Sequence, residues 1–158
     1  MLYISLKTLH LLAVIVWIGG MVFAQFFLRP AVAILAIPDR VRLMHDVVGR
    51  FFDAVLFLAL LVLVTGGWMI ARPARQMALS GVKFNMPLEW TVMAALGLVM
   101  LVIFGYLRWV LYQRLTRAVA ALDWAAGAAA LAGIRTWVMV NLVIGVVIVL
   151  VTLSGAAS

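Results

Sequence analysis

One histidine stands inside the first long apolar segment of the chain and is the strongest candidate for chemistry. His10 is flanked by Leu9, Leu11 and Leu12, and an ionisable side chain inside an apolar span is costly and marks a functional site by default. Imidazole is a common ligand of metal ions and of haem iron. We predict that His10 binds a metal or haem. The alternative is an interfacial histidine that hydrogen-bonds to a neighbouring helix or to water.

Three methionines could add ligands near His10. Met69 and Met93 fall at a similar depth to His10 if their helices are antiparallel neighbours, and Met86 precedes Met93 by seven residues. That spacing places both on one face of a helix that extends so far back. Thioether and imidazole ligands together suit copper(I), and histidine–methionine ligation also suits haem. Methionine is also a common apolar filler, so ordinary packing is the alternative for each.

A second set of polar residues lies at helical spacing ahead of the second apolar segment. It comprises Arg42, His45, Asp46, Arg50 and Asp53. Asp46–Arg50 and Arg50–Asp53 are spaced for ion pairs, and we expect Arg108, Arg135 and Asn141 to meet them at the same level. The favoured role is a structural polar lock with lipid-headgroup contacts. Proton relay or propionate binding by the arginines is the alternative.

Other kinds of chemistry find no support in the sequence. The chain has no cysteine, which removes disulfides, thiolate metal sites and thiol nucleophiles. No pattern resembles a catalytic triad, a phosphate loop or paired catalytic carboxylates, so we name no catalytic residue. We favour a protein that is not an enzyme, because redox chemistry here would need a bound cofactor.

Membrane-spanning helices must position these residues. Of the 158 residues, 68% are hydrophobic and 11% are charged, whereas a typical soluble domain has about 25% charged residues. About 20 apolar residues cross the hydrocarbon core, and the qualifying regions are residues 8–28, 54–71, 90–107 and 137–153. We predict an all-α membrane protein, a single domain over residues 1–158, with four transmembrane helices in an up-down-up-down bundle.

The connections between these helices differ in character. Residues 39–53 are expected to extend the second helix out of the membrane on the cytoplasmic side. Residues 72–89 contain two prolines and a glycine, which predict an irregular loop. Residues 112–134 are rich in alanine, and we expect them to form short helices at the membrane interface. His45 then lies far from His10, so the two cannot bind one metal within a subunit.

Basic residues predict the orientation of the bundle. Eight Lys and Arg residues lie in the 29–53 and 108–136 connections, against four in the N-terminus, the 72–89 loop and the C-terminus. The side richer in these residues faces the cytoplasm, so we expect both termini on the opposite side. The net charge of +7 then reflects topology and anionic lipid headgroups, not nucleic acid.

Several short segments carry a family resemblance. They read KTLHLL at 7–12, VWIGGMVF at 16–23, GRFF at 49–52, LVTGGW at 63–68, ALGLVM at 95–100 and NLVIG at 141–145. They resemble the copper-resistance D (CopD) family of bacterial inner-membrane proteins. The resemblance implies a four-helix unit in the bacterial inner (cytoplasmic) membrane, with periplasmic termini and a link to copper handling.

A related group, the HemJ-type protoporphyrinogen oxidases, has a similar first-span histidine that is associated with haem b. The matching position in this chain is His10. Those enzymes also carry a lysine-containing motif at the start of the third span, where this chain has residues 87–91, PLEWT, without lysine. This difference argues against oxidase activity.

The leading hypothesis is a CopD-like membrane protein that binds haem b or copper through His10 and serves copper handling or electron transfer. One alternative is a haem-dependent membrane oxidoreductase of the HemJ type, and another is an accessory membrane subunit without a cofactor. The expected partners are the lipid bilayer and a periplasmic copper or electron-transfer protein. A homodimer would also fit.

Overall fold

The chain is almost entirely helical in a computed structural model that describes residues 1–81, 83 and 85–156. The elements are α1 (Leu2–Phe23), the π-helical segment η1 (Ala24–Leu28), α2 (Arg29–Val32), α3 (Ile37–Leu79), α4 (Leu88–Tyr106), the π-helical segment η2 (Leu107–Leu111), α5 (Tyr112–Ala120) and α6 (Trp124–Ala156). These described residues contain no strand. The all-α prediction is therefore confirmed.

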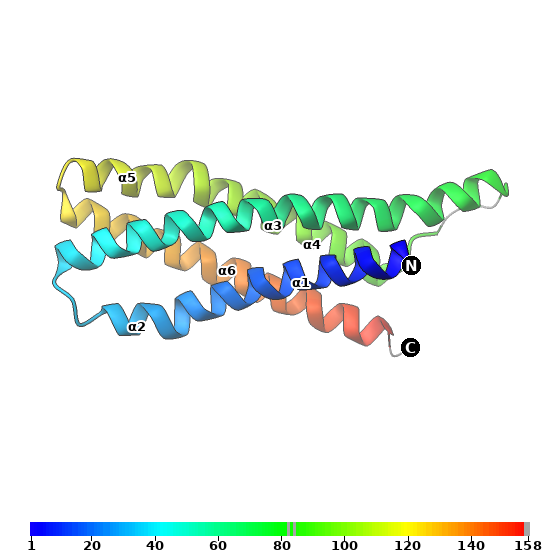
Figure 1. The fold of residues 1–158 in the computed structure, drawn as a ribbon, viewed down its shortest axis with the longest axis horizontal. Coiled ribbons are helices and arrows are strands. Elements are labelled where there is room, and N and C mark those ends of the chain that lie inside the picture. The colour runs from blue at the N-terminus through cyan, green and yellow to red at the C-terminus, as the bar shows by residue number, and fades with distance from the viewer. Residues whose placement is uncertain (82, 84, 157–158) are drawn as a thin grey trace.

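The helical segments join into four long rods that lie side by side and alternate in direction (Figure 1). The first rod is α1, η1 and α2, the second is α3, the third is α4, η2 and α5, and the fourth is α6. All four are long and apolar enough to cross a membrane. The prediction of four spanning helices in an up-down-up-down bundle is confirmed, and both termini lie at one end of it (Figure 1).

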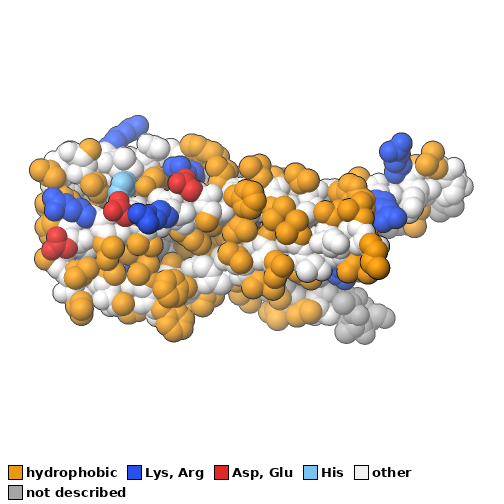
Figure 2. Space-filling model, in the orientation of Figure 1, with side chains coloured by type: hydrophobic (Ala, Val, Ile, Leu, Met, Phe, Trp, Pro, Cys, Tyr) orange, Lys and Arg blue, Asp and Glu red, His pale blue; other side chains and the backbone are white. Residues whose placement is uncertain are grey.

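Apolar side chains cover the outside of the rods as well as the inside. Ile15, Phe57, Val102 and Leu150, one from each rod, are all more than half exposed. On the face drawn in Figure 2, charged side chains gather towards the two ends, and hydrophobic side chains cover the region between them. Water would penalise such a surface, so it fits the hydrocarbon core of a bilayer.

The core lies where the four rods face one another. Trp17 of α1 and Phe52 of α3 both pack edge-on against Phe104 of α4, with ring centroids 6.1 Å and 5.8 Å apart. Leu142 of α6 is buried in the same cluster. Edge-on aromatic pairs add favourable energy beyond apolar burial. These contacts therefore help to fix the position of α1, α3 and α4 along one another.

The second rod is longer than the sequence suggested. α3 contains residues 39–53 and 54–71 in one uninterrupted helix, and it continues to Leu79 with Pro73 inside it. The expected irregular loop is therefore wrong for residues 72–79. A proline costs a helix one backbone hydrogen bond, which long membrane helices tolerate because the freed carbonyl finds other partners.

The expected interfacial helices at residues 112–134 are also wrong. Residues 112–120 continue the third rod as α5, and α6 already begins at Trp124. The turn between them contains Leu122 with φ of 55°, and the Asp123 carboxylate accepts a hydrogen bond from the Ala126 N–H at 2.9 Å. This carboxylate caps the first turn of α6, so the alanine-rich segment extends the bundle.

Candidate metal site at His10

His10 is half-buried on α1 and packs against α3. Its Nδ1 lies 2.9 Å from Oγ1 of Thr65. A Cβ atom placed on the next residue, Gly66, would lie 3.1 Å from Cε1 of His10, which is closer than ordinary van der Waals contact. The imidazole therefore rests on the α3 backbone at a position where only glycine leaves it full room.

The hydrogen bonds of Thr65 determine which ring nitrogen of His10 carries the proton. Thr65 is 2% exposed, and its hydroxyl donates to the backbone carbonyl of Leu61 at 2.6 Å. A hydroxyl has a single proton to donate, so Oγ1 of Thr65 accepts the bond from Nδ1–H of His10. In the neutral ring Nε2 of His10 then carries the lone pair, and the only side-chain hydrogen bond of ordinary geometry at this ring within the described residues is the one at Nδ1.

This arrangement is the one that metal-binding histidines use. A ligating imidazole usually donates its other N–H to a neighbouring acceptor, which fixes the tautomer and the orientation of the ring. In His10 that role falls to Nδ1–H and the Thr65 hydroxyl. The nitrogen that remains, Nε2, is the one able to bind an ion.

Met69 lies one helical turn beyond Thr65 on α3. The two residues are four positions apart, and residues at that spacing share a helix face. Thr65 is on the face that contacts His10, and Met69 is half-buried. The Met69 thioether therefore belongs to the same side of α3 as the imidazole.

Met93 lies at the depth of His10 on α4. A Cβ atom on Gly145 of α6 would lie 3.2 Å from Ile18 and 3.4 Å from Met100, so those two residues share a level in the bundle. α1 and α4 run in the same direction (Figure 1), and two helical turns back from that level lie residue 11 and Met93. Met93 is half-buried.

Met86 does not lie on the same helix as Met93. α4 begins at Leu88 with Pro87 at its N-cap, so Met86 lies outside the helix and the seven-residue spacing does not place the two on one face. Within the described residues, no group of three His, Cys, Asp or Glu side chains could hold a metal ion. A site made of three such side chains is therefore not present around His10 in the described part of the chain.

The sequence matches a family model described as CopD, copper resistance protein D, over residues 45–154. This chain belongs to the CopD family. The matched region includes Thr65, Met69 and Met93 and begins after His10. No curated protein and no solved structure matches the chain significantly. Family membership indicates a multi-pass membrane protein of copper resistance.

The polar set at the other end of the CopD bundle is built only in part as predicted. Asp53 accepts a bond from Nη2 of Arg108 at 2.9 Å, which joins α3 to η2. Arg50 forms no ion pair in the part of the chain that the structure describes, so the expected Asp46–Arg50 and Arg50–Asp53 pairs are wrong. The charge of Asp53 is matched across helices and not along its own helix.

His45 links α3 to α5. Its Nε2 lies 3.1 Å from Oγ1 of Thr116, and its Nδ1 lies 3.3 Å from the Asp46 carboxylate. Its ring stacks on Tyr112 with centroids 5.2 Å apart. His45 precedes Thr65 by twenty residues of one helix, or about 30 Å, so His45 and His10 cannot bind one ion within a subunit.

Asn141 stands apart from this set. It is 1% exposed within α6, and its Oδ1 has no hydrogen-bond partner among the described residues. The prediction that it joins the polar cluster finds no hydrogen bond to support it.

Proposed function

We propose that this CopD-family protein handles copper in the membrane by binding copper(I) at Nε2 of His10. The proposal rests on the hydrogen-bond chain from Nδ1–H of His10 through the Thr65 hydroxyl to the carbonyl of Leu61. That chain orients the imidazole and leaves Nε2 as the ring nitrogen that can bind an ion. Copper is the cargo of the protein in this proposal.

The donors around His10 favour copper(I) over harder cations. Met69 shares the Thr65 face of α3, and Met93 lies at the same depth on α4, so both thioether sulfurs are candidate additional ligands. Imidazole with thioether suits copper(I), whereas calcium and magnesium require several oxygen ligands. We therefore assign the thioethers of Met69 and Met93 as the further ligands of the ion.

The place of His10 in the bundle supports an exchange of copper at the periplasmic side of the membrane. It lies on α1 towards the end that holds both termini (Figure 1). With the termini in the periplasm, as the basic residues predict, His10 would be close to the periplasmic surface of a bacterial inner membrane. A periplasmic copper-carrying or electron-transfer protein would then be the partner that delivers or collects the ion.

Haem b bound through His10 is a second candidate, and the same free Nε2 supports it. One imidazole from each subunit is enough for an axial bond to haem iron, so a homodimer would supply two. Arg29 lies nineteen residues beyond His10, or about 28 Å along the first rod. The arginines of that end therefore cannot bind the propionates of a haem whose iron is bound to His10.

The test is metal analysis with a reduced-minus-oxidised absorption spectrum, on protein purified from cells supplied with both copper and haem. The wild type is compared with His10→Ala, and with His45→Ala as the matched histidine control. We expect copper in the wild type and in His45→Ala, none in His10→Ala, and no haem spectrum. A b-type spectrum that is present in the wild type and lost in His10→Ala would show that the ligand of His10 is haem and not copper. Copper retained by His10→Ala would overturn copper binding at His10, and a wild type without a b-type spectrum would overturn haem.

A further inference from the structure

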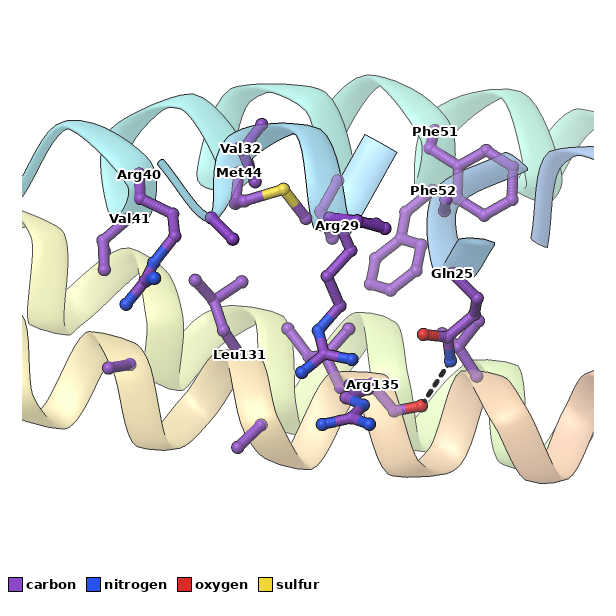
Figure 3. Close-up of a pocket in the computed structure, with 18 residues that line it drawn as sticks. Gln25, Arg29, Val32, Arg40, Val41, Met44, Phe51, Phe52, Leu131 and Arg135 are labelled. Atoms are coloured by element: carbon purple, nitrogen blue, oxygen red, sulfur yellow. Dashed lines mark hydrogen bonds between the residues drawn. The ribbon is translucent and has the colours of Figure 1, made fainter. Parts of the chain in front are cut away.

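A cavity of about 450 Å³ lies between the first rod, α3 and α6, at the end of the bundle away from the termini. Three arginines line it, each from a different rod: Arg29 of α2, Arg40 of α3 and Arg135 of α6. Figure 3 shows the Arg29 and Arg135 side chains close together and Arg40 farther along the cavity. None of the residues that line this arginine cavity is an Asp or Glu.

The three guanidinium charges lack a counter-charge. None of them forms an ion pair within the described part of the chain, and like charges that share a cavity repel one another. Arg29 and Arg135 are exposed and Arg40 is half-buried, so a ligand can reach all three from outside the bundle. An anion that entered the cavity would offset the repulsion between them, so the charge pattern points to a negatively charged ligand.

The remaining wall of the arginine cavity is apolar and well supported. Phe52, Leu131 and Ile134 are among its lining residues. Gln25, 8% exposed, donates to the backbone carbonyl of Arg135 at 2.7 Å and so ties η1 to α6. Irregular π-helical turns such as η1 often occur at functional sites. The ligand therefore needs an apolar body as well as a negative charge.

We propose that the arginine cavity binds the phosphate group of an anionic phospholipid, with an acyl chain against the apolar wall. Guanidinium groups bind phosphate oxygens in paired hydrogen bonds, and basic pockets between transmembrane helices bind anionic headgroups such as that of cardiolipin. Cardiolipin, with two phosphates, matches three arginines better than a lipid with one. This site is separate from His10 and does not depend on copper.

The experiment measures the melting temperature of the detergent-purified full chain during titration with cardiolipin, with phosphatidylcholine and with inorganic phosphate. The test variant is the double change Arg29→Gln and Arg135→Gln. The matched control is Arg114→Gln, which removes an exposed arginine of α5 that does not line the cavity. Arg40→Gln repeats the test with the third arginine if the double variant does not fold.

We expect cardiolipin to raise the melting temperature of the wild type and of Arg114→Gln. In the double variant, cardiolipin should bind roughly tenfold more weakly, since two charged hydrogen-bonding groups are lost. Without lipid, that variant should melt at or above the wild-type temperature, because the repulsion is gone. Equal cardiolipin binding by wild type and variants, or equal effects of phosphatidylcholine, would overturn the site. An inorganic phosphate effect as large as that of cardiolipin would overturn the lipid as its ligand.

Discussion

Nδ1 of His10 and Oγ1 of Thr65 lie 2.9 Å apart although 55 residues separate them in the sequence. The contact joins α1 to α3, and the Thr65 hydroxyl donates its own hydrogen bond to the carbonyl of Leu61. The imidazole thus has one tautomer and one orientation. A histidine held in this way is ready to bind an ion without first ordering its ring, which lowers the entropic cost of binding.

Thr65→Val should weaken copper(I) binding while the bundle stays folded. Valine has nearly the shape of threonine but cannot accept the bond from Nδ1–H, so the ring loses its fixed tautomer. Loss of such a partner typically lowers metal affinity about 10- to 100-fold. Competition with a copper(I) chelator measures the affinity. Thr136→Val is the control, because the Thr136 hydroxyl bonds only to its own helix, at Ala132. Unchanged affinity in Thr65→Val would contradict the role of the pair.

The methionine assignments predict unequal effects of three similar substitutions. Met69→Leu and Met93→Leu should each lower copper(I) affinity, by roughly tenfold or about 1.4 kcal/mol, because each removes a thioether at the depth of His10. Met86→Leu should have no effect, since Met86 lies outside α4. The same chelator competition compares them. Equal losses of affinity in all three variants would contradict the assignment of Met69 and Met93 as copper(I) ligands.

Asp53→Asn should lower the free energy of unfolding slightly. The change leaves Arg108 without its 2.9 Å partner, and Nε of Arg108 is already buried without a hydrogen bond among the described residues. The Asp53 side chain is 66% exposed, so the pair is worth at most about 1 kcal/mol. Denaturant titration in detergent measures the loss, with Asp39→Asn as an unpaired control. A larger loss at Asp39 would contradict this prediction.

Gly49→Ala should disturb the link between α3 and α5. A Cβ atom on Gly49 would collide with the hydroxyl of Tyr112, and the Tyr112 ring stacks on His45. Overpacking of this kind costs about 1–3 kcal/mol.

The check is thermal unfolding of Gly49→Ala alone and combined with Tyr112→Phe, which removes the colliding hydroxyl. The double variant should recover most of the loss, and Gly67→Ala should be neutral because nothing lies near that position. A double variant as unstable as Gly49→Ala alone would place the strain elsewhere.

The helices and the position of His10 could be predicted because both are local properties of the sequence. Apolar length alone identifies a membrane-spanning segment, and an ionisable residue within it stands out. Arg108 as a partner for Asp53 was also among the expectations, because a charge near the hydrocarbon boundary requires a counter-charge. Each of these follows from the cost of placing a group in lipid.

Thr65 and the arginine cavity could not be predicted because they depend on how the helices pair. Thr65 was visible beside two glycines in the segment LVTGGW, but only the register of α1 against α3 shows that it meets His10. In the same way, Arg29, Arg40 and Arg135 come from three rods and share a cavity only in the folded bundle. Apolar length gives the number of helices but not their mutual rotation.

The most direct test of copper binding at His10 is a copper(I) titration of purified protein against a competing chelator, wild type beside His10→Ala. The hydrogen-bond geometry predicts stoichiometric binding by the wild type and at least about 100-fold weaker binding by the variant, because the ligand itself is lost. His45→Ala should match the wild type. Equal affinities in wild type and His10→Ala would contradict the assignment of His10 as the copper ligand.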